Sequence, residues 1–591
     1  MEQISSGADL LNDVILRDGQ RGVWLRFHAP HRIIQAVTAA DVIPGLRDLE
    51  EHVTKDGLYA AGFIAYEAAP GLDPALTVKE SSGFPLLWFG LYGPPEEVAP
   101  PPSSPDFALD PIPWTPSESG DEYFRALGKI REHIREGDTY QVNHTFRLAA
   151  PYTADPWVTF LRLLGPVAPP FSAFVMTERW AICSASPELF FDLDGRRIRS
   201  RPMKGTAPRG LTRSEDDVRA HALHASEKDR AENVMIVDMV RNDLGRIAEP
   251  GSVEVSDLFT VERYPTVLQM TSTVTARTHA RFTEIIRALF PPASITGAPK
   301  PRTMTIIRET ESTPRHVYTG SIGFLAPGRR AQFNVAIRTV LIDRERHRAE
   351  YGVGGGIVWD SDPHAELEEC RTKAQVLLDA HPQFELLETM LWQPDEGFSL
   401  LDRHLSRLRD SAAYFAFAFD EEAIGRELTA LARSLPPAAH RVQLTMARSG
   451  RITVRAAVQS PVTEGSSYRV CVAPWPIDAA DPFLYHKTTN RSVYRKAMAA
   501  CPGFEDVLLW NQSGEVTESC IANVVVEVEG ALWTPPVRCG LLAGTYRAQL
   551  VEEGKVRERV LKVSEVLQSA RILLANSVRG LFPVEVASSG L

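Results

Sequence analysis

The chain has 591 residues, more than one hydrophobic core usually serves, so two to four domains are expected. Apolar residues make up 44% of the chain and charged residues 24%, as in ordinary globular proteins. The net charge of −11 argues against a nucleic-acid-binding surface, and no apolar run approaches the length of a membrane helix.

The N-terminal residues 1–19 lack the basic start and apolar core of a signal peptide. Six scattered cysteines form no CxxC pair, which favours reduced thiols in a cytoplasmic protein. Apolar runs at 59–66 and 85–92, bounded by Gly and Pro, predict buried strands. A proline-rich stretch at 93–116 then reads as a connector, because it cannot hold a helix or a central strand.

A long mixed α/β pattern follows this connector and runs to about residue 380. A short break at 381–383 separates it from a new α/β pattern that continues to the end of the chain. We therefore expect an N-terminal region at 1–115, a catalytic domain at 116–380 and a second domain at 384–591. The first two should form one large layered α/β (α+β) fold, and the third a smaller α/β fold with two subdomains.

Two segments carry carboxylates at helical spacing. In the first, Asp229 and Glu232 are three residues apart and share one helix face. In the second, Asp362 is the expected N-cap and Pro363 fits the first helical position. Glu366, Glu369 and Lys373 then follow on one face of that second helix.

Spacing alone leaves two interpretations open. The first is a solvated helix face with a Glu369–Lys373 pair, which contributes only about 0.2–0.5 kcal/mol. The second is a pair of helices that aim carboxylates at one hard cation, and Mg²⁺ suits such a set. Glycines at 352 and 354–356 would let the backbone approach a ligand closely. Ile357 breaks the GxGxxG pattern and no Walker motif is present, so nucleotide binding is a weak alternative.

A series of strings across residues 120–378 resembles the chorismate-utilising family, which includes anthranilate synthase, isochorismate synthase and aminodeoxychorismate synthase component I. The strings are GDTYQVN (137–143), SASPEL (184–189), KDRAENVMIVDMVRND (228–243), SITGAPK (294–300), YTGSIG (318–323), AIRT (336–339) and GGGIV (354–358). They occur in the family's order, and chance agreement of so many separate strings is negligible.

The resemblance implies a metal site. Glu232 and Glu369 would bind Mg²⁺, and Asp229 and Glu366 would support it through water. The metal would hold the ring carboxylate of chorismate.

The same resemblance implies the remaining substrate contacts. Arg338 and Lys373 would neutralise the enolpyruvyl carboxylate, and the fork of an arginine suits a carboxylate. Read alone, Arg338 is a surface arginine at a strand end. Gly355 and the backbone of 319–321, which includes Gly320, would line the site, and Thr206 is expected to contact the substrate.

The string RPMKGT (201–206) distinguishes members of the family. Anthranilate synthases resemble it but carry Ala at the position of Lys204, whereas Lys there resembles aminodeoxychorismate synthase. A neutral lysine amine can attack carbon 2 of chorismate and expel the carbon-4 hydroxyl, after which ammonia adds at carbon 4. Read alone, Lys204 is a solvated surface lysine.

Three further features of the sequence bear on this interpretation: Gln141, Gln269 and the lack of a glutaminase-type cysteine. Isochorismate and salicylate synthases resemble the family with Lys at the position of Gln141, so hydration of chorismate is disfavoured here. Gln269 stands where many relatives have His, which leaves the general acid unassigned. No cysteine has the setting of a glutamine amidotransferase nucleophile, so a separate glutaminase subunit or free ammonia is implied.

The last third of the chain resembles the fold-type IV pyridoxal-phosphate family, which includes branched-chain and D-amino acid aminotransferases and 4-amino-4-deoxychorismate lyase. The strings are HLSRL (404–408), SAA (411–413), YHKTTNR (485–491), EVTESCIAN (515–523), TP (534–535), GLLAGTYR (540–547) and NSVRG (576–580). Outside this set, Lys487 reads as an ordinary basic loop residue and Glu518 as a surface strand residue.

By that resemblance, Lys487 would form the Schiff base with pyridoxal 5′-phosphate. Glu518 would pair with the pyridine nitrogen and make the ring an electron sink. Arg407 would bind the phosphate, helped by Asn523 and by backbone donors near Thr545. The string at 576–580 resembles the lyase more than the transaminases, although fold alone does not settle that choice.

The combined hypothesis is amination of chorismate followed by elimination of pyruvate, which gives 4-aminobenzoate for folate synthesis. Two alternatives stay open: an anthranilate-type synthase fused to a class IV aminotransferase, and a non-catalytic scaffold for a glutaminase. A homodimer through the second domain is expected by resemblance only. The sequence leaves open whether the N-terminal region binds a regulator and whether the halves channel their intermediate.

Overall fold

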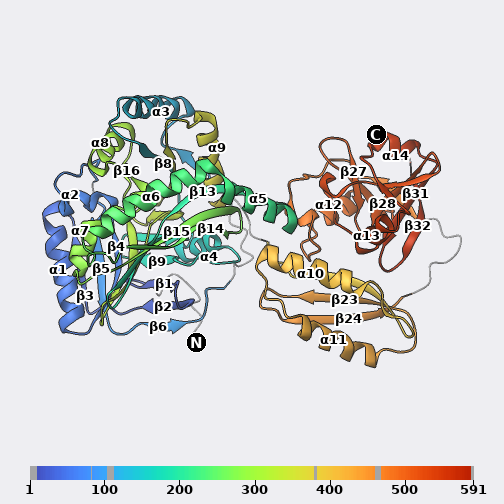
Figure 1. Cartoon of the computed structure of the whole chain (residues 1–591). Helices are drawn as coiled ribbons and strands as arrows, with labels where there is room; N and C mark the ends of the chain where they lie inside the picture. Colours follow the sequence, from blue (N-terminus) through green and yellow to red (C-terminus); the bar gives the residue numbers. More distant parts are fainter. Residues whose placement is uncertain (1–9, 82, 103–111, 378–381, 460–467, 588–591) are drawn as a thin grey trace. The chain divides into compact units, whose positions relative to one another are not determined.

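The computed structural model describes residues 10–81, 83–102, 112–377, 382–459 and 468–587 (Figure 1). Residues 103–111 of the expected connector and residue 381 of the expected break lie outside these ranges. The chain divides into two compact units. Unit 1 comprises Met1–Pro208 and Ala220–His381, and unit 2 comprises Arg209–Arg219 and Pro382–Leu591. A separate division of unit 1 at residue 115 stays a prediction.

Unit 1 contains two antiparallel sheets of ten strands each. Sheet A has the order β16 (Gly297–Ala298), β8 (Gln141–Pro151), β20 (Arg348–Ile357), β19 (Thr339–Asp343), β10 (Trp180–Ser184), β9 (Ala173–Met176), β1 (Val14–Asp18), β2 (Val23–Phe27) and β6 (Glu96–Val98), with β7 (Thr115–Pro116) beside β8. Sheet B has the order β13 (Met203–Pro208), β15 (Val267–Arg277), β12 (Arg197–Arg201), β11 (Leu189–Asp194), β18 (Arg330–Asn334), β17 (Ser321–Ala326), β4 (Tyr59–Ile64), β5 (Leu87–Tyr92) and β3 (Arg32–Ala36), with β14 (Glu254–Arg263) beside β15.

The strands expected at 59–66 and 85–92 are therefore confirmed as β4 and β5, and they pair with each other in sheet B. Both have fully or almost fully buried residues, as their apolar sequences require. In the described part of the proline-rich stretch, the only strands are β6 at the end of sheet A and the two-residue β7. Proline lacks the N–H that a central strand must donate, which explains this edge position.

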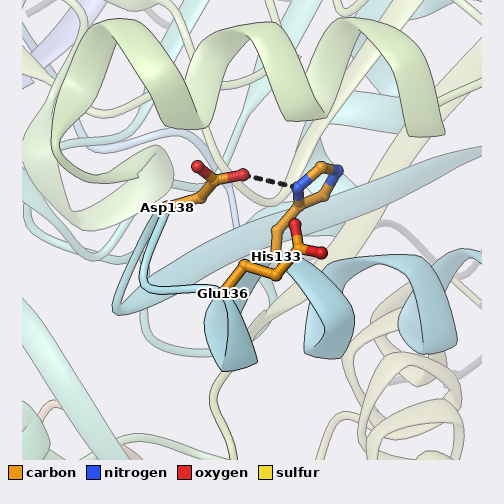
Figure 2. A group of neighbouring side chains, drawn as sticks. All are labelled: His133, Glu136 and Asp138. Atoms are coloured by element: carbon orange, nitrogen blue, oxygen red, sulfur yellow. Dashed lines mark hydrogen bonds and ion pairs between the residues drawn. The ribbon is translucent and has the colours of Figure 1, made fainter.

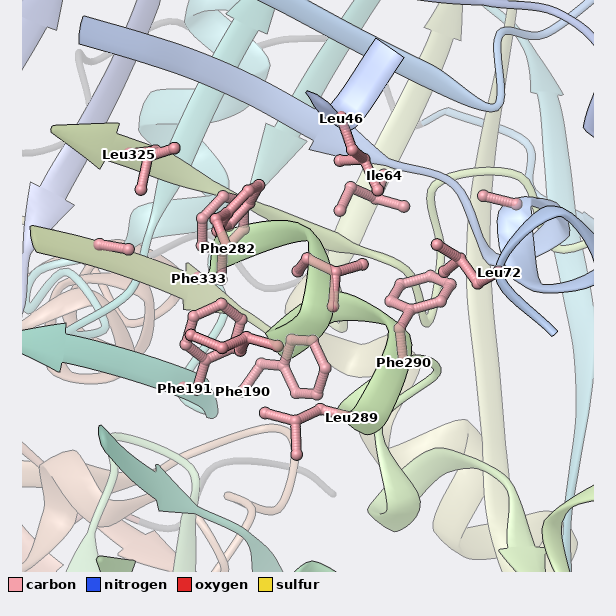
Figure 3. Packing of buried hydrophobic residues seen from close by; sticks show 14 of the residues in the cluster. Leu46, Ile64, Leu72, Phe190, Phe191, Phe282, Leu289, Phe290, Leu325 and Phe333 are labelled. Carbon is pink, nitrogen blue, oxygen red and sulfur yellow. The ribbon is translucent and has the colours of Figure 1, made fainter. Parts of the chain in front are cut away.

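Helices cover the outer faces of both sheets. The helices of this unit are α1 (Ala39–Lys55), α2 (Ala69–Leu72), α3 (Gly120–Arg135), α4 (Pro156–Leu164), α6 (Glu227–Gly245), α7 (Phe282–Leu289), α8 (Lys300–Thr310) and α9 (Pro363–Ala374). One core packs α1, α6 and α7 on sheet B, a second packs α3, α4, α8 and α9 on sheet A, and a third lies between the sheets. Figure 3 shows aromatic rings of the first core, where Phe191 stacks on Phe333 with centroids 5.3 Å apart.

The second carboxylate helix begins as the sequence predicted, and the first has a cap of the same kind. Asp362 caps α9, since its side chain accepts a hydrogen bond from the Ala365 N–H at 2.9 Å, and Pro363 is the first helical residue. Ser226 caps α6 in the same way through the Asp229 N–H. These caps fix where each helix starts and hence which residues face the sheets.

Unit 2 has a small sheet and a large one. Sheet C has the order β22 (Gly397–Phe398), β21 (Leu386–Gln393), β23 (His440–Met446) and β24 (Ile452–Val458). Sheet D has the order β27 (Val516–Ser519), β26 (Asp506–Trp510), β25 (Arg469–Val472), β32 (Gly580–Val586), β31 (Arg571–Asn576), β28 (Asn523–Val528), β29 (Ala531–Thr534) and β30 (Arg557–Glu558). Its helices are α10 (Leu401–Phe415), α11 (Glu421–Ser434), α12 (Ser492–Ala500), α13 (Thr545–Glu552) and α14 (Val563–Gln568).

The chain enters unit 2 twice. It leaves unit 1 after β13, contributes Arg209–Arg219 to unit 2 with the first turns of α5 (Arg213–Ala225), and returns to unit 1 at Ala220. Within unit 2, Leu211 packs on the core around Tyr485, and the Tyr414 hydroxyl donates to the Gly210 carbonyl at 2.7 Å.

The mixed helix and strand content confirms the predicted fold class. Within the described ranges, no helix combines the length and apolarity needed to cross a lipid bilayer.

Candidate active sites

A cavity of about 400 Å³ in unit 1 gathers most of the predicted site residues. Its wall contains Lys204, Thr206, Asp229, Glu232, Arg338, Gly355, Glu366, Glu369 and Lys373. They come from β13, from α6, from the segment before β19, from β20 and from α9. Gly320 is not part of this wall. A Cβ atom on Gly320 would lie 2.2 Å from the Ile64 carbonyl oxygen, and its predicted role at the substrate site stays a prediction.

Two ion pairs lie across this cavity. Lys204 Nζ lies 3.6 Å from Glu232 Oε2, and Lys373 Nζ lies 2.8 Å from Glu369 Oε1. Lys373 lowers the pKa of Glu369. Burial alone would lower the pKa of Lys373, but Glu369 raises it above its ordinary value. Lys373 also donates to the Gly354 carbonyl at 2.8 Å, which ties α9 to β20.

The carboxylates of α6 and α9 are hard oxygen donors of the kind that Mg²⁺ prefers, but among the described residues no three of them bring oxygen atoms within 4.8 Å of one another. Burial raises the pKa of Glu366, and the negative charge of Glu369 raises it further. A divalent cation bound beside these carboxylates would offset that repulsion.

The glycines of β20 let side chains from neighbouring elements reach the same point. A Cβ atom on Gly356 would lie 2.2 Å from Lys204 Nζ and 2.8 Å from Gln141 Nε2. No side chain fits there without displacing both groups. Gln141 is buried, and neither atom of its amide has a hydrogen-bond partner among the described residues.

Gln269 has a structural role that the sequence did not reveal. Its Nε2 donates to the Gly205 carbonyl at 2.8 Å, and its Oε1 accepts from the Thr206 hydroxyl at 3.0 Å. Both ends of the amide therefore hold β13, the strand that carries Lys204.

Glu188 is a candidate functional residue that sequence reasoning missed. It is 3% exposed, lines the same cavity and accepts a hydrogen bond from Ser294 Oγ at 2.6 Å. Burial raises the pKa of Glu188 to about 7. The string SASPEL (184–189) contains it, but burial, which makes it an acid at neutral pH, is invisible in the string.

A second group of possible metal ligands lies at the end of α3 and shares no residue with this cavity (Figure 2). His133 Nδ1 and Asp138 Oδ2 are 2.8 Å apart, and Arg302 donates to the same carboxylate oxygen. Arg302 lowers the pKa of Asp138 and already supplies its counter-charge. We assign no metal to this group.

A cavity of about 380 Å³ in unit 2 contains the second set of predicted residues. Its wall contains Arg407, Lys487, Glu518, Asn523 and Thr545, together with 576–579 of the turn between β31 and β32. Burial, with Arg407 nearby, lowers the pKa of the Lys487 amine to about 8. Burial raises the pKa of Glu518 to about 8.

Arg407 is held by a buried carboxylate. Its Nε and Nη2 donate to Glu388 at 2.9 and 2.7 Å, and His404 Nδ1 contacts the same carboxylate at 2.6 Å. Burial alone would raise the pKa of Glu388, but Arg407 and His404 hold it at about 2. Arg407 also donates to the Ala543 carbonyl, just before α13.

The N-terminus of α13 faces this cavity through Gly544 and Thr545. First-turn N–H groups have no partner within a helix, so they suit an anion such as a phosphate. A Cβ atom on Gly544 would lie 1.9 Å from Asn523 Oδ1, and this close approach needs glycine. A buried amine, a buried carboxylate and this anion site together fit pyridoxal phosphate.

Three further cationic side chains line the unit 2 cavity and were not predicted. Arg441 extends from β23, Arg491 precedes α12, and Arg579 lies in the turn between β31 and β32. With Arg407 they make the cavity wall strongly positive. Such a wall suits a ligand that carries several carboxylates or phosphates.

Comparisons with known proteins give one family match in each unit. Residues 14–379 match the family model described as chorismate binding enzyme, and residues 385–586 match the model for amino-transferase class IV. Aminodeoxychorismate synthase component 1 of Klebsiella aerogenes is 43% identical over 267 residues, 45% of this chain and 59% of that protein. An anthranilate synthase component 1 of Haloarcula marismortui is 42% identical over 269 residues, 45% of this chain and 53% of that protein.

The chain thus spans between half and three fifths of the length of these two relatives. Among solved structures, anthranilate synthase component I from Streptococcus pneumoniae TIGR4 has a TM-score of 0.53 at 24% identity, over 64% of this chain and 94% of that one. This likeness shows the fold alone. The chain belongs to the chorismate binding enzyme family, and a class IV amino-transferase domain follows in the same polypeptide.

Proposed function

We propose that unit 1 aminates chorismate at carbon 4 to give 4-amino-4-deoxychorismate. The observation that carries this proposal is Lys204, whose amine lies in the same cavity as the carboxylates of α6 and α9. Relatives named for both chemistries match this chain at almost the same identity, so overall similarity does not separate them. The presence of Lys204 favours amination at carbon 4, because anthranilate formation needs no nucleophile at that position.

Different residues of the cavity would bind different groups of chorismate. Glu232 and Glu369 would hold Mg²⁺, with Asp229 and Glu366 beside them, and the metal would supply positive charge for the ring carboxylate. Arg338 and Lys373 provide the cations for the enolpyruvyl carboxylate.

Lys204 and Glu188 supply the covalent step and the proton. The Lys204 amine must first release to solvent the proton of its ion pair with Glu232. The neutral amine then attacks carbon 2, the ring double bond shifts, and the carbon-4 hydroxyl leaves as water with the proton of Glu188. Ammonia then adds at carbon 4, the double bond shifts back, and the bond from carbon 2 to Lys204 breaks. The proton lost by ammonia restores Glu188. A buried carboxyl with a pKa of about 7 can give and regain a proton at neutral pH.

The ammonia would come from a separate glutamine amidotransferase subunit or from solution. None of the six cysteines has the sequence setting of a glutaminase nucleophile. All six are buried, and burial raises the pKa of five of them, which disfavours the reactive thiolate.

We further propose that unit 2 eliminates pyruvate from 4-amino-4-deoxychorismate to give 4-aminobenzoate. Lys487 would hold pyridoxal phosphate, Glu518 would face the pyridine nitrogen, and Arg407 with the N-terminus of α13 would hold the phosphate. When bound, the cofactor supplies an electron sink for negative charge at carbon 4 of the substrate.

Lys487 and two arginines of the cavity wall would act on the substrate. Lys487, whose pKa is about 8, takes the proton from carbon 4. The bond from carbon 3 to the ether oxygen then breaks, and the enolpyruvate that leaves becomes pyruvate on protonation. The ring becomes aromatic, which drives the step. Arg441 and Arg579 provide cations for the two carboxylates of the substrate.

Product analysis tests both steps. The full chain receives chorismate, ammonia, Mg²⁺ and pyridoxal phosphate, and we expect 4-aminobenzoate and pyruvate. Lys487→Ala should let 4-amino-4-deoxychorismate accumulate. Lys204→Ala should stop amination but still convert supplied 4-amino-4-deoxychorismate. Anthranilate as the product would favour the anthranilate-type alternative, and no turnover with ammonia would favour a scaffold.

A further inference from the structure

The carboxylate of Glu518 has a neighbour with no role in the proposed reaction. Tyr494, on the first turn of α12, donates its phenol hydrogen to Glu518 Oε1 at 2.7 Å. Both side chains line the unit 2 cavity, and Glu518 is 4% exposed. A hydrogen bond to an ionised acceptor is about twice as strong as a neutral one, so this contact favours the carboxylate over the acid.

We propose that Tyr494 is a positioning residue of the cofactor site, which favours the ionised form of Glu518 and fixes its carboxylate for the pyridine nitrogen of pyridoxal phosphate. The inference rests on the function proposed for unit 2. It adds a group that acts through Glu518, without contact to the reacting atoms.

The surroundings of Glu518 explain why such a partner is needed. Burial raises the pKa of this carboxyl to about 8, whereas the Tyr494 hydrogen bond, the Leu542 backbone and the charges of Lys487 and Arg491 lower it. A protonated Glu518 could not serve as the counter-ion of a protonated ring nitrogen. Even with these contacts the pKa of Glu518 stays at about 8, so each of them increases the fraction of the carboxyl that is ionised near neutral pH.

The Tyr494 phenol stays protonated, and its ring has a fixed position. Burial and the negative charge of Glu518 raise the pKa of its phenol well above the ordinary value. The guanidinium of Arg491 lies 4.5 Å from the centre of the Tyr494 ring, and Arg491 donates to the Cys520 carbonyl. The phenol therefore always carries its proton in the physiological range, and its ring is fixed between Arg491 and Glu518.

The test compares Tyr494→Phe with the parent in the full chain loaded with pyridoxal phosphate. Loss of one hydrogen bond should raise the Glu518 pKa by about one unit. The absorbance change of the bound cofactor with pH and the acidic limb of lyase kcat should then both move about one unit to higher pH. At neutral pH, kcat should fall several-fold with KM for 4-amino-4-deoxychorismate little changed, and higher pH should restore kcat.

Tyr485→Phe is the matched control. Its phenol also makes one hydrogen bond, to the Ala479 carbonyl at 2.8 Å, and Tyr485 does not line the cavity. It should leave the spectrum and the pH profile unchanged. A Tyr494→Phe spectrum and profile that superimpose on those of the parent would overturn the inference.

Two measurements of cofactor binding complete the test. If Tyr494→Phe retains too little cofactor for a spectrum, dissociation constants for pyridoxal phosphate replace it. Tyr494→Phe combined with Glu518→Gln should then bind no more weakly than Glu518→Gln alone, and a further loss would overturn the inference. A parent chain that binds no pyridoxal phosphate would instead refute the function proposed for unit 2.

Discussion

Ser294 Oγ donates to Glu188 Oε1 at 2.6 Å, and both side chains lie on the wall of the cavity that contains Lys204. Glu188 thus has a fixed orientation and, since burial raises its pKa to about 7, a proton to give at neutral pH. In the proposed reaction this pair would supply the acid that Gln269 cannot, because an amide does not titrate.

Glu188→Gln should therefore lower amination of chorismate by about 10²–10⁴-fold, the range typical for a lost general acid. The variant keeps the size of the side chain, and the Ser294 hydroxyl can still donate to its amide oxygen. Initial rates with ammonia as the nitrogen source measure the effect. Lyase turnover of supplied 4-amino-4-deoxychorismate is the internal control, and amination at the parental rate would remove Glu188 from the mechanism.

The same carboxyl should make unit 1 less stable as pH rises. The pKa of Glu188 is higher in the folded state than in the unfolded chain, so its favourable contribution is complete below about pH 4.5 and is lost as pH rises through about 7. The total is of order 3 kcal/mol. Glu188→Gln should accordingly raise the Tm of unit 1 more at pH 8 than at pH 5, and an equal shift at both values would contradict the assignment.

Gly356→Ala should displace the Lys204 amine. The added Cβ would lie 2.2 Å from Lys204 Nζ, so we expect amination to fall at least tenfold while the chain stays folded. Gly128→Ala is the matched control, because no atom lies within 4 Å of its added Cβ and Gly128 lies inside α3. It should keep full activity and gain up to about 1 kcal/mol of helix stability.

Removal of divalent metal should separate the two activities. With a chelator present, amination of chorismate should stop, because the α6 and α9 carboxylates lose the cation that holds the ring carboxylate. Elimination from supplied 4-amino-4-deoxychorismate should continue at its normal rate. Added Mg²⁺ should restore amination, and amination that resists the chelator would refute a metal at Glu232 and Glu369.

Glu388→Gln should weaken binding of pyridoxal phosphate about tenfold, because Arg407 loses the charged partner that orients it. Since Arg407 and His404 lower the folded-state pKa of Glu388 to about 2, its stabilising effect is present above about pH 4.5 and is lost as pH falls toward 2. Fluorescence titration with the cofactor measures the dissociation constant. Glu385→Gln, which changes an outer carboxylate 3.7 Å from Arg451, should bind normally.

Short-range patterns predicted the parts of each site that depend on helix geometry. The Asp362 cap and the i, i+3 spacing of Glu366 and Glu369 fix which face of α9 carries the carboxylates, and the structure has them on the cavity wall. Family strings added Lys204 and Lys487, because covalent chemistry restricts those positions to one residue type.

Burial and long-range contacts could not be predicted from the sequence. Nothing in the string around Glu188 reveals that the carboxyl is desolvated, and the amide of Gln269 gains its role only because β13 pairs with its strand, β15, in sheet B. Glu388 and Arg407 are nineteen residues apart and meet only when α10 packs on β21. Such pairs follow from the tertiary fold.

The excursion of Arg209–Arg219 means that the second enzyme is not encoded by one uninterrupted stretch. A gene divided before codon 382 would deprive it of the Leu211 side chain in its core and of the carbonyl that Tyr414 engages. Ancestral or engineered separation of these enzymes therefore has to replace eleven residues from the interior of its neighbour. A single cut between two consecutive segments would therefore not separate unit 2 intact from unit 1.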